Sequence, residues 1–200
     1  TSFGSGLYAV DVDAGWAQTC AVINDGRVMC WGQGSNGRLG TGNSFQQTTP
    51  TFTASLGTDR YAKQVVQGGG HGCAVIDDGT VKCWGSGIST GTGGTSDVFT
   101  PTTTDSLGAG RTAHALIAGT GHVCAILDDA TMTCWGHGGL GRLGNGATDN
   151  QLSPVPVITT GVPQYWQVSD FLVDPDNRDF RPVWGSPLHI LGAGAYAADE

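Results

Sequence analysis

Residues 20–32 read CAVINDGRVMCWG, and the same phrase returns as CAVIDDGTVKCWG at residues 73–85 and as CAILDDATMTCWG at residues 124–136. The copies recur about every 50 residues, a period typical of repeat architectures. Each copy has a short apolar, partly β-branched run, a turn signal, and a second run that ends in Trp-Gly. Such runs favour β-strands, and Asp-Gly between them favours a hairpin turn. The sequence therefore predicts an internal repeat with a strand–turn–strand core.

The spacing of the two cysteines in each copy selects the hairpin loop. A three-residue loop at Asp77-Asp78-Gly79, with glycine in the left-handed conformation, places Cys73 opposite Cys83. Cross-strand Cβ atoms lie about 4.5–5.5 Å apart, close to the roughly 3.5–4.5 Å of a disulfide. A two-residue loop would place Trp84 opposite Cys73 instead. The third copy has Ala130 in place of the glycine, so its turn should carry strain or differ in type.

The six cysteines are predicted to form three structural disulfides: Cys20–Cys30, Cys73–Cys83 and Cys124–Cys134. Each closes a short loop and should contribute about 2–3 kcal/mol. A metal site is the alternative, but no CxxC pair occurs and ligands ten residues apart on one hairpin are not a usual zinc spacing. Free cytosolic thiols are the other alternative. Disulfides in every repeat indicate an oxidising location: extracellular, cell surface or virion.

The composition agrees with a loop-rich β protein. Glycine accounts for 34 of 200 residues, and the formal net charge is −8 with nine Lys and Arg. So acidic a chain is not expected to bind nucleic acid, because little neutralises phosphates. No apolar run approaches the roughly 20 residues of a membrane span. Residues 54–66 are a weak helix candidate. No signal peptide is visible and the chain starts at Thr1 and not at methionine, so we expect a processed form or a fragment.

The repeat resembles the blade of the RCC1 family (regulator of chromosome condensation repeats), in which a glycine-rich lead, two strands around Asp-Gly, Trp-Gly and Gly-x-Leu-Gly follow in order. Copy one supplies Asp13-Ala14-Gly15 and, at residues 36–42, NGRLGTG; copy three supplies residues 119–122 and, at 141–146, GRLGNG. Copy two has Ile88–Gly94 in place of Gly-Arg-Leu-Gly. The resemblance covers about residues 10–160, and the cysteines are similar to those of a secreted, disulfide-bearing branch.

This resemblance implies an all-β fold of three propeller blades, with Trp31, Trp84 and Trp135 packed between blades. His71 and His122 stand where copy one has Ala17 or Gln18, and we expect them to hydrogen-bond within their blades. The family's ring has about seven blades, and propellers generally have four to eight. Three blades therefore form an incomplete ring or an open array, whose exposed edges favour partners.

We expect three segments along the chain. An N-terminal strand segment covers residues 1–12, three repeats cover residues 13–163 (about 13–60, 61–112 and 113–163), and a C-terminal tail covers residues 164–200. Residues 44–55 and 95–106, rich in threonine and serine, are interpreted as blade connections. The alternative is that their threonines and serines carry O-linked sugars, which would make the chain a glycoprotein. No Asn-x-Ser/Thr sequon occurs, so N-glycosylation is not expected.

The C-terminal tail is predicted to be extended β structure and to cap the chain or contact a neighbouring subunit. Its Asn-x-Asp-Phe-Arg…Gly-Ser-Pro phrase resembles the closing segment of secreted right-handed parallel β-helix proteins, but no coil repeats accompany it. Asp174, Asp176 and Asp179 suggest calcium, whose preferred ligands are oxygens at such alternating positions. Because Arg178 interrupts the pattern and no late glutamate follows, we prefer a solvated turn and expect no metal or other cofactor.

No catalytic constellation is apparent in the sequence. Asp77-Asp78 and Asp128-Asp129 are adjacent turn residues, not two carboxylates across a cleft. We therefore expect no enzyme but a structural subunit of an extracellular filament, surface appendage or virion, which associates with itself or with other subunits. The alternatives are a secreted recognition module for a protein or glycan, and a glycan-active enzyme. The nucleotide-exchange role of nuclear RCC1 proteins fits disulfides poorly.

Overall fold

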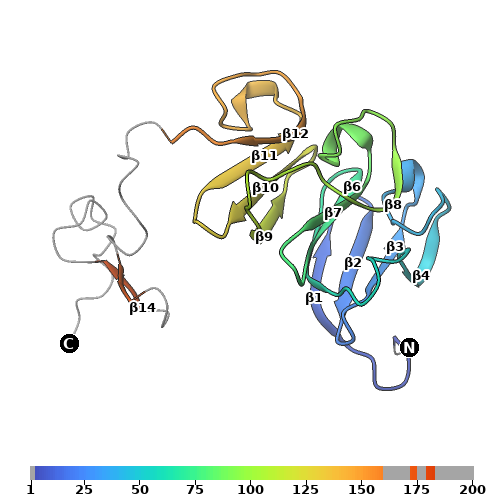
Figure 1. Ribbon diagram of the computed structural model, residues 1–200. Coiled ribbons are helices and arrows are strands. Elements are labelled where there is room, and N and C mark those ends of the chain that lie inside the picture. The colour runs from blue at the N-terminus through green and yellow to red at the C-terminus, as the bar shows by residue number, and fades with distance from the viewer. Residues whose placement is uncertain (1–2, 160–171, 175–178, 183–200) are drawn as a thin grey trace, which may run out of the picture. The chain divides into compact units, whose positions relative to one another are not determined.

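The computed structural model describes residues 3–159, 172–174 and 179–182. Three antiparallel four-stranded sheets follow one another along the chain (Figure 1), and we call them blades 1, 2 and 3. Within each blade the strands pair in sequence order. Blade 1 contains β1 (Ala9–Ala14), β2 (Gln18–Ile23), β3 (Val28–Gly32) and β4 (Gln47–Phe52); blade 2 contains β5 (Ala62–Gln67), β6 (His71–Ile76), β7 (Val81–Gly85) and β8 (Val98–Thr103); blade 3 contains β9 (Ala113–Ala118), β10 (His122–Leu127), β11 (Met132–Gly136) and β12 (Gln151–Pro156).

The chain divides into two compact units, Thr1–Ile158 and Thr159–Glu200. The first unit holds all three blades. In the second, the described residues form one antiparallel hairpin of β13 (Leu172–Asp174) and β14 (Asp179–Pro182). The all-β fold class is thus confirmed, and the three blades do not close a ring.

The hairpin of strands two and three has the predicted register in every blade. Cys73 lies opposite Cys83, and the Ile76 amide donates to the Thr80 carbonyl at 2.9 Å, which closes a three-residue loop. The three predicted disulfides are formed, each with a Cα–Cα distance of 4.1 Å. Ala130 adopts a φ of 64°, in the left-handed region, so the strain predicted for the third turn is confirmed.

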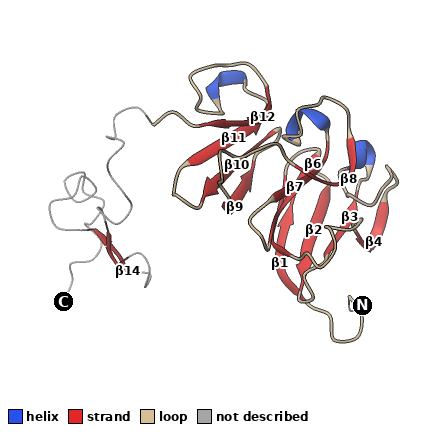
Figure 2. Cartoon of the chain, viewed as in Figure 1, coloured by secondary structure: helices blue, strands red, loops and turns tan. Residues whose placement is uncertain are grey.

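Helical structure among the described residues is limited to three short 3-10 segments, which follow the third strand of each blade (Figure 2): η1 (Ser35–Gly37), η2 (Gly87–Ser89) and η3 (Gly139–Gly141). The helix candidate at residues 54–66 is wrong, because β5 begins at Ala62. Gly57, at a φ of 119°, breaks any helical run, and Val65 and Val66 are buried on the sheet. No helix of the described residues is long and apolar enough to cross a membrane.

Two strand boundaries in the structure differ from those expected from the sequence. The first blade begins at Ala9, so residues 9–12 belong to β1 and do not form a separate N-terminal strand. The expected connections at residues 44–55 and 95–106 contain the outer strands β4 and β8. Each outer strand carries proline at its fourth residue, namely Pro50, Pro101 and Pro154. Because proline lacks an amide hydrogen, it weakens further pairing at a sheet edge.

The hydrophobic core lies between blades, because alternate side chains of a strand point to opposite faces. We define the leading face of a blade as the side toward the preceding blade; in blade 2 it consists of Ala62, Val65, Ala74, Ile76 and Trp84, which cluster with blade 1. We define the trailing face as the side toward the following blade; in blade 2 it consists of Val66, Cys73, Val75, Val81 and Cys83, which cluster with blade 3. The cysteines thus line the trailing face.

Candidate functional site

The junction between blades 1 and 2 has the same design as the junction between blades 2 and 3. The indole Nε1 of Trp84 donates to the Arg38 carbonyl at 3.0 Å, and that of Trp135 donates to the Ser89 carbonyl at 3.2 Å. Both tryptophans are fully buried. Each indole therefore joins its blade to the end of the 3-10 segment of the blade before it, and its burial makes the hydrogen bond costly to lose.

Backbone hydrogen bonds repeat at both junctions. The Ala62 amide donates to the Gly26 carbonyl, and the Ala113 amide donates to the Gly79 carbonyl, both at 2.8 Å. Farther out, Gly42 donates to the Phe99 carbonyl and Gly93 to the Leu152 carbonyl, both at 2.9 Å. These backbone hydrogen bonds therefore occupy equivalent positions at the two junctions.

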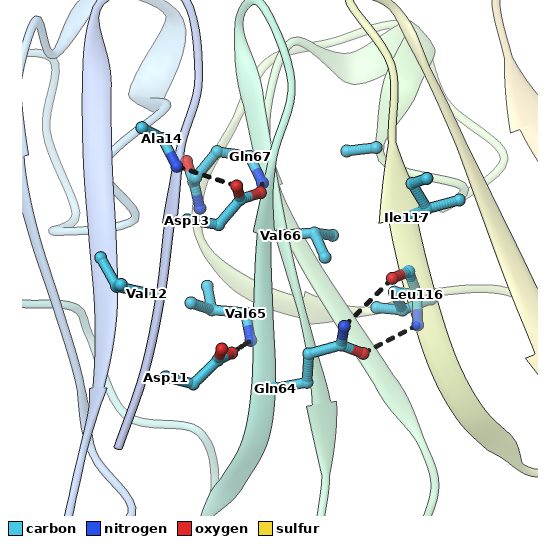
Figure 3. Close-up of a pocket in the computed structure, with 11 residues that line it drawn as sticks. Asp11, Val12, Asp13, Ala14, Gln64, Val65, Val66, Gln67, Leu116 and Ile117 are labelled. Carbon is cyan, nitrogen blue, oxygen red and sulfur yellow. Dashed lines mark hydrogen bonds between the residues drawn. The ribbon is translucent and has the colours of Figure 1, made fainter. Parts of the chain in front are cut away.

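The inner strands β1, β5 and β9 lie side by side and are linked by side chains (Figure 3). Asp11 Oδ2 accepts from the Val65 amide at 2.8 Å. At the equivalent position of blade 2, the Gln64 side chain accepts from the Leu116 amide at 2.8 Å and donates to the Leu116 carbonyl at 3.1 Å. These side chains satisfy backbone groups of the next blade that no strand pairing reaches.

A groove of about 350 Å³ runs over these inner strands. Its lining includes Asp11, Asp13, Gln64 and Gln67 but no Lys, Arg or His (Figure 3). Asp13 Oδ2 accepts a hydrogen bond from the backbone amide of Gln67, with an N–O distance of 2.7 Å. The side-chain amide of Gln67 is buried, and among the described residues neither its nitrogen nor its oxygen has a hydrogen-bond partner. A buried, unsatisfied amide is costly, and a polar group that reached it would relieve that cost.

Comparisons with known proteins agree with this blade geometry. Two family models described as the regulator of chromosome condensation (RCC1) repeat match residues 9–38 and 25–75. The chain carries RCC1 repeats. It is 35% identical over 159 residues to the ultraviolet-B receptor UVR8 of Arabidopsis thaliana, a match that covers 78% of this chain and 36% of the receptor. It is 28% identical over 193 residues to the human E3 ubiquitin-protein ligase HERC2, covering 93% of this chain and 4% of the ligase.

Solved structures show the same blade fold. Human WBSCR16 superposes with a TM-score of 0.69 at 22% identity, over 82% of this chain and 43% of that structure. Prp20p of Saccharomyces cerevisiae superposes with a TM-score of 0.67 at 19% identity, over 74% of this chain and 38% of that structure. The chain thus spans less than half the length of the relatives and structures named here. These likenesses establish the blade fold and carry no activity over to this chain.

Among the described residues, no blade lies against either end face of the three-blade array. On blade 1, Trp31 is partly exposed beside the cluster of Ala21, Ile23 and Met29, and Val12 is 61% exposed. On blade 3, large apolar side chains of the trailing face and its 3-10 segment reach solvent: Ile117, Ile126, Met132 and Leu140. Two of the three blade tryptophans therefore lie between blades, whereas Trp31 lies on an open face.

His71 and His122 occupy the positions in blades 2 and 3 that are equivalent to Gln18 in blade 1. The Gln18 side chain donates to the Gly68 carbonyl of blade 2 at 2.8 Å. His71 is fully buried, and neither ring nitrogen has a hydrogen-bond partner among the described residues, so the expected bond within the blade is absent. Burial, together with the smaller effects of the nearby His122 and His137, lowers the pKa of His71 to about 4. Burial also lowers the pKa of His122.

The acidic turns are structural, as their adjacency in the sequence indicated. Asp78 Oδ1 accepts hydrogen bonds from the Thr80 hydroxyl at 2.7 Å and the Thr80 amide at 3.0 Å, and these bonds lower the pKa of Asp78. Arg60 pairs with Asp77 at 2.8 Å and with Asp78 at 3.3 Å. Both carboxylates are thus already engaged by local partners.

The calcium prediction falls mostly on residues beyond the described parts. Asp176 lies outside them, as does most of the phrase that resembles the β-helix closing segment. Asp174 and Asp179 are backbone partners across the β13–β14 hairpin. Within residues 3–159, 172–174 and 179–182, no group of three His, Cys, Asp or Glu side chains could hold a metal ion. Calcium at this tail remains a prediction.

Proposed function

We propose that this chain is a non-enzymatic structural subunit of an extracellular assembly: a filament, a surface appendage or a virion component. The observation that carries the proposal is the apolar character of both end faces. Val12 at blade 1, 61% exposed, and Ile117 and Leu140 at blade 3, 69% and 96% exposed, are residues that a different subunit of the assembly would cover. Exposed apolar groups that gather on such faces mark interaction sites.

The three disulfides support an oxidising, extracellular location for this subunit. Each joins strands two and three of a blade, so every blade is covalently clamped at its most buried hairpin. Disulfides persist in secreted and surface proteins and are rare in the cytosol. Clamped blades resist local opening, which suits a mechanical element.

The contact with neighbouring subunits is assigned to the tail, residues 164–200. Residues 1–12 are less suited to this role than the sequence suggested, because Ala9–Ala14 already pairs with β2. An extended tail can add a strand to a sheet edge of a neighbour. The outer strands β4, β8 and β12 form an edge of each sheet, and a tail strand would pair there on either side of the proline that each strand carries.

The test is the state of the non-reduced full chain, measured by light scattering and negative-stain electron microscopy. We expect regular polymers or defined oligomers, and a chain without residues 164–200 should lose them. Val12→Glu is the matched control, because it alters a blade face and leaves the tail intact. A monodisperse monomer for the full chain, or unchanged assembly without the tail, would contradict the proposal.

A secreted recognition module is the second candidate, and the groove over the inner strands favours it. The Gln67 amide lacks partners among the described residues, and Asp11, Asp13 and Gln64 offer further polar atoms. Such a groove suits hydroxyl-rich or amide ligands, including glycans or a peptide. Binding on a glycan panel that is lost in Gln67→Leu, but retained in the exposed control Thr48→Val, would favour this candidate. Turnover of a polysaccharide would instead support a glycan-active enzyme.

A further inference from the structure

The hairpin turn of each of the first two blades lies directly against the next blade. A Cβ atom at Gly26 would lie 2.1 Å from Tyr61 Cβ, and one at Gly79 would lie 2.5 Å from Thr112 Cβ. Both distances are far below a van der Waals contact, and the atoms belong to the segment that enters the next blade. Glycine is therefore required at these turns for two reasons, the φ of 83° and 79° and the closeness of the following blade.

The third turn has the same shape but contains a side chain. The Ala130 amide donates to the Leu127 carbonyl at 3.0 Å, as Gly26 donates to Ile23 at 2.7 Å and Gly79 to Ile76 at 2.9 Å. Ala130 also keeps the positive φ, at 64°. Its Cβ consequently projects into the space that the entering segment of a further blade would occupy.

A second copy of this chain would bring Tyr8 to that space. The segments that enter the three blades share two positions with positive φ. The first position is Gly4, Gly57 or Gly108, and the second is Gly6, Asp59 or Gly110. In this alignment Tyr8 corresponds to Tyr61, and Phe3 to the buried Leu56. The leading face of blade 1 is thus a complete half of a blade junction, and only the opposite half decides whether two copies join.

We propose that Ala130 prevents this chain from associating head to tail through its blade faces. A second copy that docks on blade 3 as blade 2 docks on blade 1 would place Tyr8 Cβ against Ala130 Cβ. Blade 3 also has Ala115 where Asp11 and Gln64 hold the inner strand of the next blade, so it lacks that link. The apolar trailing face of blade 3 therefore excludes a copy of this chain in the junction geometry. This inference is independent of the proposed function, in which the tail makes the contact.

The experiment measures the mass of the full, non-reduced chain by sedimentation velocity over a range of concentrations. Five chains are compared: the natural sequence, Ala130→Gly, Ala130→Ser, Val12→Glu, and Ala130→Gly combined with Val12→Glu. Ala130→Ser keeps a Cβ atom. Val12→Glu puts a charge on the leading face, at the position of the buried Val65 and Leu116.

We expect Ala130→Gly to add a concentration-dependent association, with a dissociation constant at least about tenfold lower than that of the natural chain. Ala130→Ser should behave like the natural chain, and Val12→Glu should remove the added association. Association through the tail does not depend on Val12. The association that remains in the double variant is therefore subtracted from that of Ala130→Gly. The proposal is overturned if Ala130→Gly associates no more than the natural chain, or if Val12→Glu alone dissociates the natural chain.

Discussion

His71 occupies in blade 2 the place of Gln18 in blade 1, but only the glutamine forms a hydrogen bond to the next blade. Gln18 Nε2 lies 2.8 Å from the Gly68 carbonyl oxygen, whereas both ring nitrogens of His71 lack partners among the described residues. The imidazole packs closely against Gly68. A Cβ atom added at Gly68 would lie 2.1 Å from His71 Cε1 and 2.7 Å from the Gly119 carbonyl oxygen. One junction therefore has a titratable group where the other has a neutral donor.

We predict that the folded chain loses stability as the pH falls from about 6.5 to about 4. The pKa of His71 is lowered to about 4 in the folded state. Between pH 6.5 and 4 the unfolded chain therefore binds a proton at His71 that the folded chain does not bind. This stability is fully present above pH 6.5, and the loss is on the order of 3 kcal/mol. Urea denaturation at a series of pH values measures it. The carboxylates of Asp78 and Asp129, whose pKa is lowered by hydrogen bonds from Thr80 and Thr131, act at lower pH, below about 4.

His71→Gln is the matched variant for this pH dependence, because glutamine already serves at the first junction. It should flatten most of the slope between pH 6.5 and 4, while Gln18→His should steepen it. An unchanged slope in His71→Gln would show that the acid sensitivity has another source.

Ala130→Gly should stabilise the fold by about 1 kcal/mol, because it removes the cost of a non-glycine residue in the left-handed region. The opposite change, Gly79→Ala, should destabilise by more, since its Cβ meets Thr112 as well. Thermal and urea unfolding, at a concentration too low for association, compare the two. Equal and small effects would argue that the turns tolerate a side chain.

Replacement of Cys73 and Cys83 by serine should lower the free energy of unfolding by about 2–3 kcal/mol without loss of the fold. The reason is that the open hairpin gains conformational freedom in the unfolded chain. Far-ultraviolet circular dichroism reports the fold, and the melting temperature reports the stability. An unaltered melting temperature would indicate that the bond contributes nothing.

Trp84→Phe should cost about 2–4 kcal/mol, because a buried side chain shrinks and the Arg38 carbonyl loses its donor. Trp31→Phe is the control at the equivalent position of blade 1, where the side chain is partly exposed. It should cost less than about 1 kcal/mol. If the two variants unfold alike, the junction contributes less than its burial indicates.

Local signals in the sequence determined the blades, the disulfides and the unusual third turn. Cysteine spacing, Asp-Gly and alternating apolar residues act over fewer than about fifteen residues, so hairpin register and the Cys73–Cys83 bond follow without knowledge of the rest of the chain. The pattern does not show where the outer strands or the first strand begin. The sequence-based prediction places residues 9–12 outside their blade, because the pairing of β1 with β2 depends on the sheet and not on a motif.

Only the tertiary structure decided what lies between blades. The sequence shows Gly26 and Gly79 as turn residues, but their contact with Tyr61 and Thr112 of the next blade appears only when two blades are packed. The same is true of the bond from Trp84 to Arg38, 46 residues apart, and of the groove around Gln67. Hairpins are local and are specified by short patterns, whereas junctions join residues about 50 positions apart whose closeness depends on the whole array.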